Sequence, residues 1–206
     1  GQITCSLLDE LDIAYEIVSA DTTIEDVTEA MNRFRDLFDQ GKSAAFVIRK
    51  KALSFDEKPD YGNNNEMVRE KAIEVILDVA GDVPIVSTTG KPSRELFEIR
   101  EGKGQPHDSD FLTVGSMGHA SSIALGIAAQ KPESTIWCID GDGAALMHMG
   151  AMAVIGASGA ENLVHIVLDN GAHETVGGVP TASRGIDLVG IAKACGYASA
   201  VRASSY

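Results

Sequence analysis

The fold of this chain is decided by the stretch Gly141-Asp142-Gly143, which follows an apolar run at 135–139. That run is short and almost continuously apolar, which is typical of a buried strand. A run rich in small residues at 144–157 predicts a helix, and a second apolar run at 163–168 predicts another buried strand. Alternating strands and helices predict an α/β fold, a doubly wound parallel sheet with helices on both faces.

Two side chains that carry oxygen ligands stand at the ends of these predicted strands. Asp142 follows the first strand and Asn170 follows the second. In an open parallel sheet, such ends face one crevice where ligands bind. A carboxylate and an amide carbonyl suit Mg²⁺, and Mg²⁺ suits a diphosphate. The glycines beside Asp142 and the free N–H groups of the helix that starts there can approach an anion.

The motif resembles a known family. The spacing from Gly141-Asp142-Gly143 to Asn170 is similar to the metal and diphosphate motif of thiamine-diphosphate-dependent enzymes. Within them the chain resembles the phosphonopyruvate decarboxylases, and the sulfopyruvate decarboxylases are a close second. The resemblance covers nearly the whole chain and rests also on the stretches Thr88-Thr89-Gly90-Lys91-Pro92-Ser93-Arg94-Glu95-Leu96, Val114-Gly115-Ser116-Met117-Gly118-His119-Ala120 and Asn170-Gly171-Ala172-His173-Glu174.

The resemblance implies a site for thiamine diphosphate and Mg²⁺. It assigns the metal ion to the side chains of Asp142 and Asn170 and to the backbone carbonyl of Ala172. Met117 is expected to wedge between the two rings of the cofactor, and the carbonyl of Gly115 to accept a hydrogen bond from the aminopyrimidine. The cofactor-binding residues that it implies are Thr89, Gly90, Lys91, Gly115, Ser116, Met117, Gly141, Asp142, Gly143, Ala144 and Asn170, with the N–H groups of Gly143 and Ala144 facing the diphosphate.

The loop at 171–181 contains the best titratable candidates for contacting the substrate and for catalysis, His173 and Glu174. A loop of this length with three glycines at the end of a strand is suited to fold over a ligand. The alternative is a polar loop whose charges are solvated.

The other histidines give weaker indications. We expect residues 101–110 to form a loop, and His107 within it to be exposed rather than part of a lid over the site. His119 is either an ordinary residue at a helix start or a polar contact near the cofactor. We expect His148 to be a buried histidine that bonds to the backbone.

Composition limits the function classes. Of 206 residues, 17 are Lys or Arg and 30 are Asp or Glu, which gives a net charge of −13. Nucleic-acid binding needs a basic footprint, so we expect none. The three cysteines show neither disulfide nor zinc spacing, which favours a reducing cytoplasm. No apolar run reaches the length of a membrane span, so we expect no membrane-spanning helix, and we expect no signal peptide.

The chain divides by pattern into three parts. Residues 1–50 predict an αβαβ piece, which we interpret as the C-terminal tail of a truncated pyrimidine-binding domain. Residues 51–65 are polar and lack periodicity, which is typical of a linker. Residues 66–206 predict the diphosphate- and Mg²⁺-binding domain, with a helix over 66–80 and a last strand over 198–202, and we expect this domain to be incomplete at its C-terminus.

These expectations define a function. The resemblance implies non-oxidative decarboxylation of a small anionic 3-substituted pyruvate, phosphonopyruvate first and sulfopyruvate second. A non-catalytic α/β module that binds a nucleotide or phosphate is the alternative from another class. In the family, a glutamate of the first domain activates the cofactor, and no residue here can be assigned that role. We therefore expect this chain alone to be inactive and the parent protein to be a homo-oligomer with its site between subunits.

Overall fold

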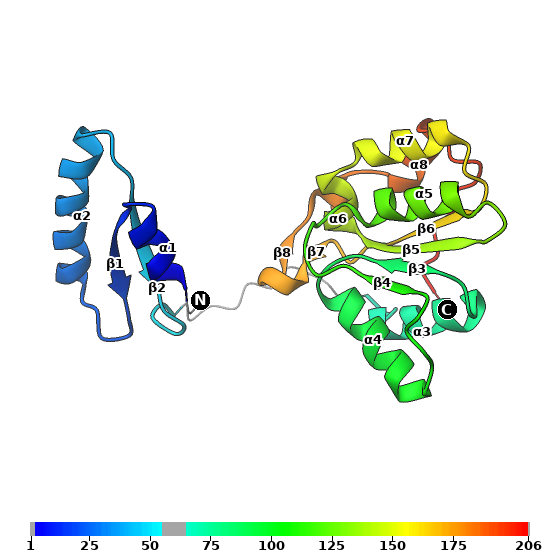
Figure 1. Ribbon diagram of the computed structural model, residues 1–206, viewed down its shortest axis with the longest axis horizontal. Helices are drawn as coiled ribbons and strands as arrows, with labels where there is room; N and C mark the ends of the chain where they lie inside the picture. The colour runs from blue at the N-terminus through cyan, green and yellow to red at the C-terminus, as the bar shows by residue number, and fades with distance from the viewer. Residues whose placement is uncertain (1–2, 55–64, 206) are drawn as a thin grey trace. The chain divides into compact units, whose positions relative to one another are not determined.

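The computed structural model describes residues 3–54 and 65–205 (Figure 1). The chain forms two compact units, 1–59 and 60–206, and their boundary falls within the stretch 51–65 predicted as a linker. Most of that stretch, 55–64, lies outside the described residues. Each unit is therefore described by itself.

The first unit is a two-stranded parallel sheet with a crossover helix. Its elements are α1 (Thr4–Glu10), β1 (Ala14–Val18), α2 (Ile24–Asp39) and β2 (Ala44–Ile48). The predicted αβαβ order is confirmed, and β1 pairs in parallel with β2 from Ala14↔Ala44 to Val18↔Ile48.

Helix α2 begins where the sequence provides a cap. The Thr23 hydroxyl accepts a hydrogen bond from the Asp26 N–H at 3.1 Å, and the Asp26 carboxylate accepts one from the Thr23 N–H at 2.9 Å. This reciprocal capping box satisfies two N–H groups that the helix leaves free. Phe34 of α2 is buried, and its ring centroid lies 5.0 Å from that of Phe46 in β2, so an aromatic pair holds the helix on the sheet.

The second unit is a four-stranded parallel sheet in the order β4-β3-β5-β6. Its elements are α3 (Arg69–Ala80), β3 (Ile85–Ser87), α4 (Lys91–Lys103), β4 (Asp110–Leu112), α5 (Ala120–Gln130), β5 (Ile136–Gly141), α6 (Asp142–Met147), α7 (Gly150–Ser158), β6 (Leu163–Leu168), β7 (Ala172–His173), η1 (Glu174–Val176), β8 (Val179–Pro180), η2 (Ala182–Gly185) and α8 (Leu188–Ala194).

Helices cover both faces of this sheet, as the doubly wound prediction requires (Figure 1). On one face, small residues of α5 such as Ala124 pack against Val86 and Cys138 of the sheet. On the other face, residues of α3 and α4 such as Ile73 and Leu96 pack against the sheet. None of the helices in the described part of the chain is both long and apolar enough to cross a membrane.

Four expectations about elements were wrong. The predicted helix over 66–80 begins only at Arg69, and α4 continues to Lys103, into a stretch we expected to be a loop. The predicted helix over 144–157 is two helices, because His148 leaves the helical region at φ −128° and ψ 46°. Residues 198–202 form no strand, because no neighbouring strand within the described residues pairs with them.

Candidate functional site

The pairing of β5 with β6 brings the predicted metal ligands to one edge of the sheet. The two strands are parallel, and Gly141 at the end of β5 lies opposite Leu168 at the end of β6. Asp142 therefore follows one strand end, and Asp169 and Asn170 follow the next. The carboxyl ends of adjacent parallel strands are the usual position of a ligand crevice.

Asp142 is almost buried, at 4% exposure, in the first turn of α6. Its Oδ2 accepts hydrogen bonds from the hydroxyls of Thr181 and, at 3.0 Å, Ser183. Both donors are buried and belong to the loop and turn before α8. We did not single out these two residues from the sequence. The only feature of the sequence that could have indicated them is a pair of hydroxyl side chains separated by one residue.

The Ser183 hydroxyl also connects the two strand ends. It lies 3.0 Å from Asp142 Oδ2 and 2.8 Å from Asp169 Oδ1. A hydroxyl carries one proton, so it can donate to only one of the two carboxylates at a time. The hydroxyls of Thr181 and Ser183 that bond to the two carboxylates are uncharged, so they leave the negative charge of Asp142 and Asp169 at this edge unneutralised. Such a position favours a divalent cation.

The Asn170 side chain is held by its own loop. Its Oδ1 accepts from the N–H of Ala172 at 3.0 Å, and its Nδ2 donates to Glu174 Oε2 at 3.3 Å. The preceding Asp169 caps the same turn by accepting from the N–H of Gly171 at 3.1 Å, and Gly171 has the positive φ, +65°, that this turn requires.

Glu174 is the centre of an ion-pair network that joins three elements. It pairs with Arg69 at the start of α3 and, at 2.5 Å, with Lys91 at the start of α4. Arg69 also forms two hydrogen bonds of 2.6 Å to the two carboxylate oxygens of Glu95. Hydrogen bonds from Arg69 and Lys91 lower the pKa of Glu174, so this carboxylate is poorly suited to donate a proton near neutral pH. Arg69 is a third residue that we did not single out from the sequence.

His173 lies against the glycine motif. A Cβ atom at Gly143 would lie 2.6 Å from Cε1 of His173, 2.7 Å from its Nδ1 and 3.4 Å from Cε of Met117. Glycine is therefore needed at 143 for these two side chains to come so close to the start of α6. The geometry brings together His173, Met117 and the backbone at 143, all three of which were predicted as site residues.

The two remaining predicted loops meet at the same edge. The Thr89 hydroxyl donates to the carbonyl of Val114, directly before Gly115, at 2.6 Å. A Cβ atom at Gly90 would lie 3.1 Å from Oγ1 of Thr175 in the loop that contains Glu174. Ser116 has a positive φ of +51°, which is uncommon for a residue with a side chain and marks a sharp turn.

Two of the other histidines, His148 and His107, differ from their expected positions. His148 is exposed rather than buried, and its ring centroid lies 4.2 Å from that of His119, whose Nδ1 lies 3.1 Å from the Ser116 carbonyl oxygen. His107 is about half-buried, because its ring stacks on Phe97 with centroids 4.3 Å apart.

A cluster of buried polar side chains lies within the sheet beside this edge. Asp140 and Cys138 of β5 are fully buried, and His165 of β6 lies opposite Cys138. His165 Nε2 is 3.4 Å from Asp140 Oδ2, and its Nδ1 is 2.9 Å from the Tyr197 hydroxyl. Burial raises the pKa of the Cys138 thiol and of Tyr197, so both stay protonated at neutral pH.

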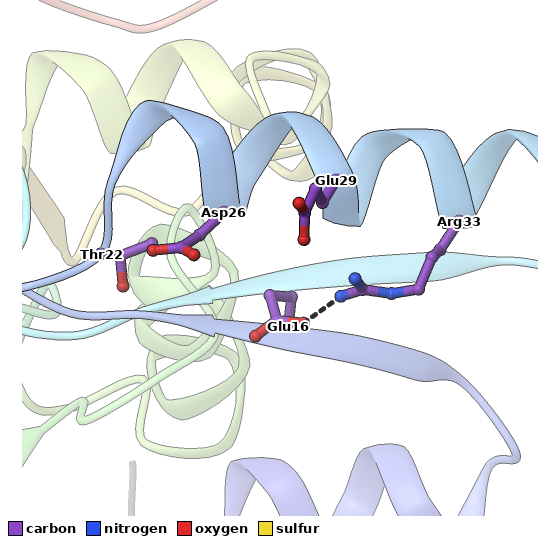
Figure 2. Close-up of a pocket in the computed structure, with 5 residues that line it drawn as sticks. All are labelled: Glu16, Thr22, Asp26, Glu29 and Arg33. Carbon is purple, nitrogen blue, oxygen red and sulfur yellow. Dashed lines mark hydrogen bonds and ion pairs between the residues drawn. The ribbon is translucent and has the colours of Figure 1, made fainter.

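A polar surface hollow in the first unit contains none of the predicted site residues (Figure 2). It is lined by Glu16, Thr22, Asp26, Glu29 and Arg33. Arg33 pairs with Glu16 at 2.5 Å, but the Arg33 side chain is 58% exposed. An exposed pair of this kind contributes little to stability.

Comparison with known families identifies the family of this chain. Residues 89–206 match the family of thiamine pyrophosphate enzymes, in its C-terminal TPP binding domain; thiamine pyrophosphate is another name for thiamine diphosphate. The match covers more than half of the chain, so the chain belongs to this family. The predicted family resemblance and the α/β fold are confirmed.

Individual relatives narrow the resemblance. The chain is 44% identical over 130 residues to a phosphonopyruvate decarboxylase of Streptomyces viridochromogenes, a match that covers 63% of this chain and 31% of that protein. It is 37% identical over 134 residues to a sulfopyruvate decarboxylase subunit beta of Methanococcus maripaludis, which covers 65% of this chain and 69% of that subunit. The chain therefore spans about a third of the length of the phosphonopyruvate decarboxylase that it matches.

A solved structure supports the fold alone. It is an X-ray structure from Mycobacterium smegmatis assigned to a thiamin diphosphate-dependent enzyme. The TM-score is 0.51 at 21% identity, and the match covers 70% of this chain and 30% of that one.

Proposed function

We propose that this chain provides the diphosphate- and Mg²⁺-binding site of a thiamine-diphosphate-dependent decarboxylase that converts phosphonopyruvate to phosphonoacetaldehyde and CO₂. The observation that carries the proposal is the pairing of Gly141 with Leu168, which sets Asp142 and Asn170 at neighbouring strand ends. The membership of residues 89–206 in the TPP binding family supports the same conclusion.

The residues at this edge fit a magnesium ion. Within the described residues, Asp142 and Asp169 accept hydrogen bonds only from uncharged groups, the hydroxyls of Thr181 and Ser183 and the N–H of Gly171, so a cation would balance their negative charge. Asp142 and Asn170 would hold Mg²⁺ through their side chains, and Ala172 through its backbone carbonyl. These are hard oxygen ligands of the kind that Mg²⁺ prefers.

Bound thiamine diphosphate supplies an electron sink for the loss of CO₂ from a 2-oxo acid. The chain would bind the diphosphate through the N–H groups of Gly143 and Ala144 at the start of α6, where a helix N-terminus favours an anion. Met117, which lies beside position 143, would support the cofactor rings. His173, which also lies beside Gly143, would face the substrate.

Phosphonopyruvate is the first choice of substrate because identity to the named phosphonopyruvate decarboxylase is higher, 44% against 37%. Sulfopyruvate is the second candidate. A specific observation favours it, because this chain covers 69% of a sulfopyruvate decarboxylase subunit beta. The existence of such subunits also supports an oligomer with the site between subunits.

We propose a cytoplasmic location, because the three cysteines of the chain are free and a reducing compartment keeps thiols in this state.

Calorimetric titration tests the binding site. We expect thiamine diphosphate to bind in the presence of Mg²⁺ and to bind weakly or not at all with a chelator. ATP and NAD serve as controls for a general nucleotide-binding module. Tighter binding of ATP or NAD, or the absence of Mg²⁺-dependent binding of thiamine diphosphate, would refute the proposed function.

Product analysis tests the substrate. The full-length protein is supplied separately with phosphonopyruvate and sulfopyruvate, and the aldehyde product is measured. We expect a higher kcat/KM for phosphonopyruvate. A preference for sulfopyruvate would transfer the assignment to the second candidate.

A further inference from the structure

An asparagine can hold a metal ion through one atom only. Its Oδ1 is an acceptor, whereas its Nδ2 carries two hydrogens and repels a cation. The amide plane of Asn170 must therefore be fixed in one of two orientations that differ by a half-turn. In the structure, Nδ2 points to the Glu174 carboxylate at 3.3 Å. Oδ1 accepts one bond from the Ala172 N–H at 3.0 Å and has a second lone pair.

Glu174 is held firmly enough to set this orientation. One carboxylate oxygen accepts from Lys91 at 2.5 Å, and the other, Oε2, accepts from both Arg69 and Asn170. Arg69 is itself fixed by two bonds of 2.6 Å to Glu95, and its side chain is only 19% exposed. A continuous series of charged groups thus runs from α4 through α3 to the loop after β6. Such outer partners orient the groups that bind a metal ion.

We propose that Glu174 is a positioning residue that turns the amide oxygen of Asn170 toward the cation. The inference rests on the proposed function, because it concerns the same Mg²⁺ and diphosphate site. It replaces our sequence-based expectation that Glu174 contacts the substrate. Both of its oxygens already face cations or the Asn170 amide, so its place is behind the metal ligand.

The test measures metal affinity rather than turnover. Mn²⁺ replaces Mg²⁺, thiamine diphosphate is present at saturation, and free Mn²⁺ is followed by electron paramagnetic resonance. We expect Glu174→Ala to weaken Mn²⁺ binding by about tenfold, the lower end of the loss for outer partners of metal ligands. Glu174→Gln keeps an acceptor oxygen and should retain most of the affinity. Glu98→Ala, at an exposed glutamate of α4, removes the same charge and should bind like the unaltered chain.

A second background separates orientation from general support of the loop. Asn170→Asp has two equivalent oxygens, so its orientation no longer matters. In that background Glu174→Ala should not weaken Mn²⁺ binding further. A merely structural role of Glu174 would give the same loss in both backgrounds.

Three results would overturn the inference. The first is unchanged affinity in Glu174→Ala, and the second is an equal loss in the Asn170→Asp background. A substitute variant is available if circular dichroism shows that Glu174→Ala is unfolded: Glu174→Met keeps the side-chain length without a carboxylate and should show the same tenfold loss of Mn²⁺ affinity. The third is the absence of cation-dependent cofactor binding by the unaltered chain, which would refute the proposed function itself and this inference with it.

Discussion

The close approach of α7 to the backbone after α8 gives a sharp prediction for stability. A Cβ atom at Gly156 would overlap the carbonyl oxygen of Cys195, and would lie 2.6 Å from its carbonyl carbon and 3.1 Å from that of Gly196. Non-bonded carbon atoms normally stay about 3.5–4.0 Å apart. The substitution Gly156→Ala would therefore push two segments apart by about 1 Å. Backbone atoms cannot rotate out of the way as a side chain could.

The expected cost follows from two opposing effects. Overpacking costs up to about 3 kcal/mol, and the upper value applies here because the obstacle is backbone. Alanine in a helix is better than glycine by about 1 kcal/mol. We therefore expect Gly156→Ala to lower the free energy of unfolding by about 2 kcal/mol. Gly126 in α5 is the matched control, because its added methyl group would meet no atom of the described residues within 4 Å apart from the backbone of its own helix. Gly126→Ala should raise the free energy of unfolding by about 0.5–1 kcal/mol.

Urea unfolding can measure both variants. The chain has one tryptophan, Trp137 in β5, so its fluorescence reports on the second unit. With a slope of about 2 kcal/mol per molar urea, the midpoint of Gly156→Ala should fall by about 1 M. The reasoning is refuted if Gly156→Ala unfolds at the same or a higher midpoint than the unaltered chain. It is refuted equally if both variants shift in the same direction.

Three further predictions concern the site and the first unit. Asp142→Asn removes a charge from the proposed cation site, so Mg²⁺ affinity measured by calorimetry with thiamine diphosphate should fall by more than the about tenfold typical for an outer partner; an unchanged affinity would place the cation elsewhere. Because hydrogen bonds from Arg69 and Lys91 lower the folded-state pKa of Glu174, its contribution to stability is present above the unperturbed value of about 4.3 and is lost as the pH falls through the lower folded value. The difference in unfolding free energy between the unaltered chain and Glu174→Gln should therefore shrink below about pH 4.3, and a difference that grows there would contradict this sign. Thr23→Ala removes half of the capping box, so hydrogen exchange of the α2 amides should show a loss of about 1 kcal/mol, and unchanged protection would show that the cap is dispensable.

The sequence was informative where one local pattern decides the structure. The apolar run before Gly141 and the spacing to Asn170 predicted two adjacent strand ends, because a parallel sheet leaves few alternatives for a strand, helix and strand. The start of α2 is of the same kind, because the Thr23 cap depends on a hydrogen bond to a residue only three positions away.

The sequence was silent where distant segments decide the structure. Ser183 donates to a carboxylate 41 residues away, and Arg69 pairs with Glu174 across 105 residues. No local pattern connects such positions. The break between α6 and α7 was missed for a different reason, since small residues continue on both sides of His148 and keep the appearance of one helix.

The pairing of β5 with β6 constrains how the length of this chain can vary. The strands run in step from Ile136↔Leu163 to Gly141↔Leu168. One residue inserted within either strand would turn every following side chain to the opposite face and would carry an aspartate or asparagine away from the shared edge. Insertions and deletions should therefore be tolerated in the turn at 159–161, between α7 and β6, but not within the strands. A motif that fixes both of its ends and leaves the interval between them adjustable is the expected evolutionary result.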